Sequence, residues 1–183
     1  MLVDDLFVIK KKRDKRLLSD RRGVYWIYLV MKKYEIYEEV DIDAEFSSFE
    51  FISVGQNGRI RKRVLFTPTF KPGIFNLAFG DINNYGELDD LTISNNGDRN
   101  KILATILNVV DRYTNRFPDR YVFFAGSTAH RTRLYRIAIS LHLEELSEMF
   151  DILADVNGDW EFVRFRKGLN VKAFLVKRKI HYI

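Results

Sequence analysis

The sequence predicts an α+β protein, with an antiparallel sheet of about five to seven strands packed against two main helices. Short β-prone runs bounded by turn residues occupy residues 49–79 and return at residues 160–176. Two longer segments between them carry apolar residues at helical spacing. Because 46% of the 183 residues are hydrophobic and 14% are aromatic, the chain can bury a sizeable core.

The first strands are expected at residues 49–54, 60–66 and 74–79. Asn57-Gly58 separates the first two runs, and Asn-Gly between β-prone segments is a strong hairpin signal. Lys71-Pro72-Gly73 then turns the chain into the third run. The sequence therefore predicts a three-stranded antiparallel meander.

The first helix is predicted over residues 99–116, because apolar side chains recur at the spacing of one buried face. Asn95, Asn96 or Asp98 can cap its first turn through a short side-chain oxygen. Pro118 ends the segment.

The second helix is expected after a buried strand at residues 121–125 and a cap formed by Gly126-Ser127-Thr128. Its apolar stripe consists of Leu134, Ile137, Ala138 and Leu141. After the turn at Asn157-Gly158, residues 160–165 and 171–176 are predicted to close the fold as a pair of strands.

The charge is distributed unevenly along the chain. Residues 1–30 contain eight Lys/Arg against four Asp/Glu, so +4 of the formal net charge of +5 lies there and the other 153 residues carry only +1. This distribution weakens a nucleic-acid interpretation based on net charge alone. The sequence has no cysteine, which excludes disulfides, thiolate metal sites and cysteine nucleophiles, and we expect a cytoplasmic protein.

We divide the chain into a basic N-terminal extension, residues 1–30, and a single α+β domain, residues 31–183. The extension is either a basic arm with an extra strand or sequence upstream of a true start at Met31. Its apolar run at residues 23–30 is far shorter than the roughly 20 residues that span a bilayer, so no membrane contact is expected.

The strongest candidate site is an anion pocket at the start of the second helix. Free amides and the positive end of a helix dipole favour anions there, and Ser127 and Thr128 add hydroxyls. Arg131 and Arg133 fall in the first turn, where the dipole disfavours cations, so a negative partner is expected nearby. Asn96 and Arg99 are expected to border this pocket.

The negative partner can instead be internal. The segment between the meander and the first helix is acidic, and any of its carboxylates could dock on the arginines and hold the loop against the helix, namely Asp81, Asp89, Asp90 and Asp98. Asp81 and Asp98 could alternatively converge as acid-base or Mg²⁺-binding carboxylates, although nothing local in the sequence brings them together.

The weaker candidates are catalytic or aromatic residues. His130, Asp98 and Tyr135 are possible catalytic groups, although a histidine in a first helical turn is more often a surface residue. The three histidines have no metal-ligand spacing, and we predict no metal and no cofactor. The aromatic and basic residues of the segment 160–166 could stack on single-stranded nucleic acid, although strand alternation explains them more simply.

Several motifs resemble an uncharacterised family of bacterial proteins, found mainly in Bacteroidetes and classed as a domain of unknown function. They are Asn-Leu-Ala-Phe-Gly-Asp at residues 76–81, Ser-Asn-Asn-Gly-Asp-Arg at 94–99, and Gly-Ser-Thr at 126–128 followed by Arg-Thr-Arg-Leu-Tyr at 131–135. The resemblance runs from about residue 49 to the carboxyl terminus. It implies where the domain begins and which surface carries the candidate site, but it implies no reaction.

Three functions stay open from the sequence. The first is a binding module whose pocket accepts an RNA phosphate or a nucleotide. The second is a small ribonuclease-like toxin enzyme that uses His130 or an aspartate with Arg131 and Tyr135. The third is the protein-interaction component of a toxin-antitoxin or defence pair, with a small protein as its partner.

Overall fold

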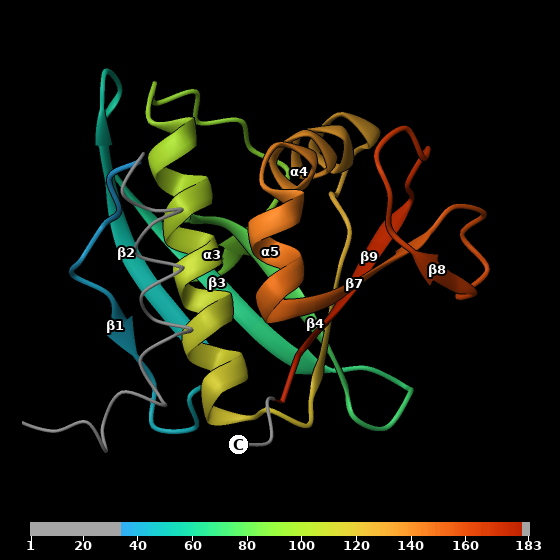
Figure 1. Cartoon of the computed structure of the whole chain (residues 1–183). Helices are drawn as coiled ribbons and strands as arrows, with labels where there is room; N and C mark the ends of the chain where they lie inside the picture. Colours follow the sequence, from blue (N-terminus) through green and yellow to red (C-terminus); the bar gives the residue numbers. More distant parts are fainter. Residues whose placement is uncertain (1–33, 181–183) are drawn as a thin grey trace, which may run out of the picture.

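A computed structural model describes residues 34–180 of the chain, and the 1–30 extension therefore lies outside the described residues. The described part contains nine strands in one sheet and three helices (Figure 1). The strands are β1 (Asp41–Ile42), β2 (Ser48–Gly55), β3 (Gly58–Pro68), β4 (Ile74–Ile82), β5 (Leu88–Asp89), β6 (Tyr121–Phe124), β7 (Phe150–Asp155), β8 (Phe162–Arg164) and β9 (Ala173–Arg178). The helices are α3 (Arg99–Arg116), α4 (Ala129–Leu141) and α5 (Leu143–Met149).

The α+β class and the predicted meander are confirmed. β2, β3 and β4 pair antiparallel in chain order, with Phe49 opposite Val64 and Val64 opposite Phe79. The β2–β3 hairpin closes between Gly55 and Gly58, and Gly58 takes the left-handed conformation that such a tight reversal needs.

The sheet is larger than predicted, and it is mixed rather than purely antiparallel. Its order is β1-β2-β3-β4-β6-β9-β7-β8, with β5 paired to β4. β4 and β6 run parallel because α3 connects them as a crossover, which parallel neighbours require. The additional strands are β7 and the two-residue strands β1 and β5, of which the latter two are too short to show a periodic pattern.

The prediction that residues 160–165 and 171–176 pair with each other is wrong. β7 lies between β8 and β9 and pairs antiparallel with both. Trp160 is not in a strand, because the Asp155 carboxylate accepts hydrogen bonds from the backbone N–H groups of Asn157, Gly158 and Trp160 and closes a turn. The short helix α5, which leads directly into β7, was also not predicted.

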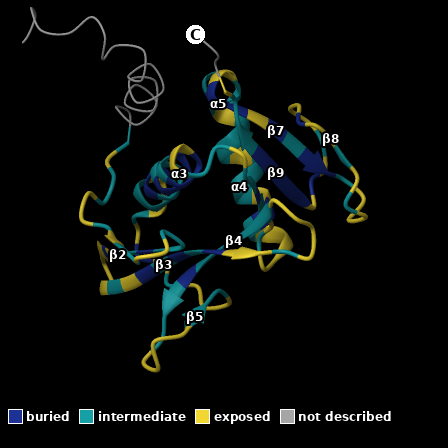
Figure 2. Ribbon diagram, turned by 90° about the horizontal axis from the view of Figure 1, so that it is seen from below, coloured by how far each residue is buried: buried dark blue, intermediate teal, exposed yellow. Residues whose placement is uncertain are grey.

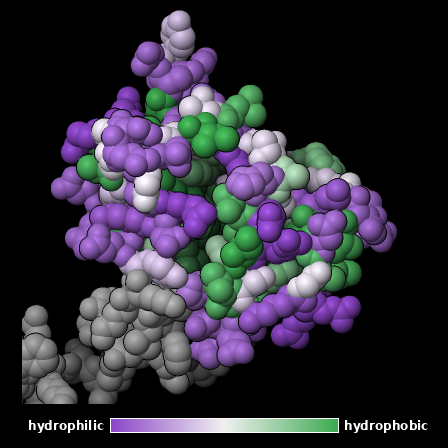
Figure 3. All heavy atoms as spheres, turned by 90° about the horizontal axis from the view of Figure 1, so that it is seen from above, coloured by the Kyte–Doolittle hydropathy of each residue, from purple (hydrophilic) through white to green (hydrophobic). Residues whose placement is uncertain are grey.

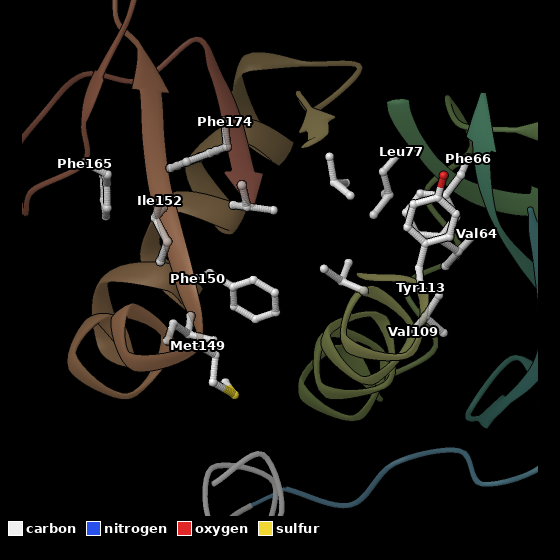
Figure 4. Packing of buried hydrophobic residues seen from close by; sticks show 14 of the residues in the cluster. Val64, Phe66, Leu77, Val109, Tyr113, Met149, Phe150, Ile152, Phe165 and Phe174 are labelled. Atoms are coloured by element: carbon white, nitrogen blue, oxygen red, sulfur yellow. The ribbon is translucent and has the colours of Figure 1, made fainter. Parts of the chain in front are cut away.

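The helices cover one face of the curved sheet (Figures 1 and 2), and the core lies between the two layers. Figure 4 shows its two halves, with Val109 and Tyr113 of α3 against β3 and β4 on one side and residues of α5, β7 and β9 on the other. The Tyr113 ring stacks on Phe66 with centroids 3.7 Å apart. Within residues 34–180, no helix combines the length and apolar character needed to cross a membrane.

Candidate functional site

A cavity of about 290 Å³ lies between α3 and α4. Strand residues form its floor, including Leu77 and Phe79 of β4, Phe124 of β6 and Val176 of β9. Figure 3 shows this side of the molecule, where apolar side chains lie in a hollow surrounded by polar surface. A concave apolar pocket of this size is where small molecules most often bind.

Apolar side chains of the two helices form the facing walls. α3 contributes Leu103, Ala104 and Leu107, and α4 contributes Leu134 and Ala138. The two alanines leave space that larger side chains would fill, since protein interiors are otherwise close-packed. The predicted stripe of α4 is therefore a cavity wall, and its outer members Ile137 and Leu141 stay 43% and 67% exposed.

The rim of the cavity is polar and basic. Arg99 and Asn100, the first two residues of α3, line it and are exposed to solvent. His142, between α4 and α5, also lines the cavity and meets the Tyr34 ring edge-on at 5.9 Å. No aspartate or glutamate of the described chain is among the lining residues. The site therefore combines apolar walls with a cationic opening.

The start of α3 combines the Asp98 carboxylate with backbone amides that have no intrahelical acceptor. Asp98 occupies the N-cap position, but its side chain does not cap the helix, because its carboxylate accepts hydrogen bonds from Tyr37 Oη at 2.6 Å and Ser53 Oγ at 2.7 Å. Burial, together with the nearby Asp98 carboxylate, raises the pKa of Tyr37. The first intrahelical bond runs from the Ile102 N–H to the Asp98 carbonyl, so the preceding amides have no intrahelical acceptor.

The structure brings the predicted residues Ser127, Thr128 and Arg131 together at the start of α4. Thr128 is the N-cap, and its hydroxyl accepts a hydrogen bond from the Arg131 N–H at 3.3 Å. Gly126 is required there, because an added Cβ would lie 2.3 Å from the Thr132 nitrogen. Thr132 Oγ1 in turn accepts from the Gly126 N–H at 3.0 Å.

The guanidinium of Arg131 is directed at the acidic loop. It donates to the backbone carbonyls of Asp90 and of Thr92, the latter at 2.8 Å, and to Ser127 Oγ at 3.2 Å. Ser127 Oγ itself donates to the Asp90 carbonyl at 2.7 Å. The loop thus docks on Arg131 as the internal alternative expected, although through carbonyl oxygens rather than carboxylates.

Other candidates at α4 lie in different environments. His130 and Arg133 are exposed, and neither lines the cavity. Tyr135 does line it and meets Phe124 edge-on at 5.9 Å. Burial raises the pKa of Tyr135, so its hydroxyl stays protonated at neutral pH and can donate a hydrogen bond.

Asn96 belongs to a buried polar group at the β2–β3 hairpin. Its Nδ2 donates to Ser53 Oγ at 2.8 Å and to the Gly58 carbonyl at 3.1 Å, and its Oδ1 accepts from the Asn57 N–H at 2.8 Å. Asn96 and Asp98 therefore both bond Ser53 and anchor the segment that leads into α3. Of the three predicted residues in this segment, only Arg99 reaches the cavity.

Asp81 and Asp98 bond different partners. Asp81 forms an ion pair with Lys62, whose side chain is only 2% exposed, and Lys62 Nζ also donates to Ser94 Oγ at 2.6 Å. Within residues 34–180, no cluster of three or more His, Asp or Glu side chains is arranged to hold a metal ion.

The aromatic and basic segment near Trp160 lies away from the cavity. The Trp160 ring stacks on Phe123 with centroids 4.6 Å apart, and Lys71 Nζ lies 5.2 Å from the Trp160 ring. Phe123 alternates along β6 with Phe124, which faces the cavity, so the cluster lies on the opposite face of the sheet. Phe70 at its edge is 74% exposed.

The cavity was missed at the sequence level, although its walls were both identified as apolar helix faces. The available signal was two small residues on the helices that form the walls, Ala138 within the predicted stripe of α4 and Ala104 beside the predicted stripe of α3. The distance between the two helices decides whether such positions are filled, and that distance is a tertiary property.

Comparison with known proteins gives a family but no activity. Residues 33–179 match the model of a family of unknown function, DUF6934. No curated protein and no solved structure matches the chain. The resemblance to a family of unknown function is thus confirmed, and the chain belongs to DUF6934.

Proposed function

We propose that this protein is a binding module for a small organic anion, held in the cavity between α3 and α4. The observation that carries the proposal is the composition of the lining, which joins apolar walls to a rim with Arg99, Asn100 and His142 and includes no described carboxylate. A ligand with an apolar body and one anionic group matches both parts.

Each part of the site contributes a different term to binding. Burial of the ligand body removes apolar surface from water, which stabilises the complex by about 25 cal/mol per Å². The Arg99 guanidinium can pair with two oxygens of a carboxylate or phosphate. The amino end of α3 adds a favourable dipole for the same anion.

This proposal keeps the anion-binding function predicted from the sequence but places the anion at Arg99 rather than at Arg131. Arg131 is a weaker choice, because its guanidinium already donates to the Asp90 and Thr92 carbonyls. The proposed class of organic anions still includes nucleotides and RNA phosphates. The bacterial, cytoplasmic setting expected from the sequence is part of the proposal.

A thermal-shift panel of organic carboxylates, nucleotides, short RNAs and inorganic phosphate tests the site. A ligand that binds only the folded state raises the melting temperature. We expect a shift that is lost in Arg99→Ala and retained in Arg116→Ala, which removes an exposed arginine from the last turn of the same helix. Each variant is compared with its own unliganded baseline. A shift that is lost only in Arg131→Ala would place the anion at α4 instead.

A protein-interaction role is the second candidate, favoured by the exposure of Ile137 and Leu141 beside the cavity. Exposed apolar side chains grouped on one helix are typical of contact surfaces. Leu141→Glu would break a complex formed through α4, whereas Arg99→Ala, which removes the proposed anion contact, would leave that complex in place. The toxin-enzyme alternative has weaker support, because the exposed His130 does not line the cavity.

A further inference from the structure

The interior of the cavity is almost entirely hydrocarbon. Its deeper walls are formed by side chains such as Leu77, Val110, Phe150, Ile152 and Val176. The side chains with polar atoms in the lining are Tyr34, Arg99, Asn100, Tyr135 and His142. Within the described chain, the floor and inner walls therefore offer few hydrogen-bond partners to a buried ligand.

This lining discriminates between ligand classes. A nucleobase carries several donors and acceptors around its edge, and each one buried without a partner weakens binding roughly ten- to a hundredfold. The backbone groups of the floor strands are already paired in the sheet. A hydrocarbon body loses no hydrogen bonds on entering such a cavity and gains from leaving water.

We infer that the ligand is an amphipathic monocarboxylate, a fatty-acyl or aryl-alkyl acid whose hydrocarbon part lies in the cavity and whose carboxylate meets Arg99. This inference rests on the proposed function and narrows its ligand class. The carboxylate stays at the rim, where Arg99 and Asn100 are exposed to solvent, so its charge is never fully buried. His142 adds a second hydrogen-bonding side chain to the lining.

The size of the cavity sets an approximate chain length. A water-sized group occupies about 30 Å³ in a liquid, so a cavity of about 290 Å³ accommodates on the order of ten such groups. A saturated acid of about ten carbons, decanoate, is therefore the probe of choice.

The test is isothermal titration calorimetry on the full chain with decanoate, 1-decanol, decyltrimethylammonium and AMP. Decanoate and decyltrimethylammonium are kept below their micelle concentrations and 1-decanol below its solubility limit. We expect decanoate to bind at least tenfold more tightly than 1-decanol and the cation to bind more weakly than either. Arg99→Gln should bring the affinity for decanoate down to that for 1-decanol. The matched control Arg116→Gln should leave both unchanged.

Two variants of the walls test whether the hydrocarbon part lies in the cavity. Ala138→Phe fills the space and should weaken decanoate and 1-decanol binding more than tenfold. Leu103→Ala enlarges the cavity and should shift the preference from decanoate towards dodecanoate. The second variant keeps the test informative if the larger side chain disturbs folding, which circular dichroism would reveal.

The possible failures are distinguishable. Binding of AMP that depends on Arg99, without binding of decanoate, would overturn the monocarboxylate but leave an anion site in the cavity. Equal binding of the acid, the alcohol and the cation, insensitive to the wall variants, would overturn the inference as nonspecific adsorption. If none of the anions tested binds, the proposed function is overturned as well.

Discussion

Arg131 illustrates how a residue predicted to bind a ligand is used within the fold. Its position in the first turn of α4 predicted a negatively charged partner, because a cation there opposes the helix dipole. The partners found are carbonyl oxygens of Asp90 and Thr92, which carry partial negative charge. Residue types alone could not separate these acceptors from an external anion.

We predict that Arg131→Ala lowers the free energy of unfolding by about 1–2 kcal/mol, because the partly exposed carbonyls of Asp90 and Thr92 lose a charged donor. Urea unfolding followed by circular dichroism measures this change. Arg133→Ala, two residues along the same helix and exposed, should change stability by less than about 0.5 kcal/mol. Equal stability of the two variants would show that Arg131 does not anchor the loop.

The buried Lys62 is a second residue whose role appears only in three dimensions. Its place in β3 among alternating apolar residues gives no indication that it pairs with Asp81 across the β3–β4 ladder. Asp81→Ala leaves the Lys62 ammonium buried without its carboxylate and should cost about 3–5 kcal/mol in unfolding free energy.

The double variant Lys62→Met/Asp81→Leu provides the control for this pair. It removes both charges and replaces them with apolar side chains, so it should recover most of the lost stability. Chemical denaturation of Lys62→Met, Asp81→Leu and the double variant forms the cycle. If the unfolding free energy of Asp81→Ala were within about 1 kcal/mol of the wild-type value, the variant would not contain a buried, uncompensated charge.

At the scale of elements, the parts predicted correctly are those with long periodic patterns or local turn chemistry. The meander at β2–β4 and both main helices are of this kind. β7 was missed because it follows α5 without a turn signal. The parallel pairing of β4 and β6 depends on where the crossover places β6, which no local sequence pattern records.

The turn between β1 and β2 provides a pH-dependent test. Burial alone would raise the pKa of Asp43, but hydrogen bonds from the Ser47 hydroxyl and the Ser47 and Ser48 N–H groups outweigh it and hold the pKa below its ordinary value of 3.8. A folded-state pKa below the unfolded value contributes stability above the unfolded pKa, and this contribution is lost as the pH falls through the folded pKa.

We therefore expect Asp43→Asn to be less stable than the wild type at neutral pH and the difference to shrink as the pH is lowered below about 4. Urea denaturation at a series of pH values measures the difference in unfolding free energy. A difference that stays constant down to the lowest pH at which both proteins fold would contradict the assigned hydrogen bonds.

At the scale of the whole molecule, the proposed function depends on a cavity rather than on a sequence motif. The loop that bonds Arg131 and Lys62 leads into Asp98 and fixes the start of α3, and with it the position of Arg99 at the rim. The helix stripes could be predicted from apolar spacing. The cavity between them could not, because it arises from how far α3 and α4 stand apart on the shared sheet.

The most direct test of the cavity as a ligand site is methyl nuclear magnetic resonance of the full chain during titration with decanoate. We predict chemical-shift changes concentrated at cavity-lining methyl groups, such as those of Leu103, Ala104, Leu134 and Ala138, and their loss in Arg99→Gln at the same ligand concentration. Shifts confined to methyl groups outside this lining, such as those of Ile52 and Val163, or no shifts at all, would contradict a ligand site between α3 and α4.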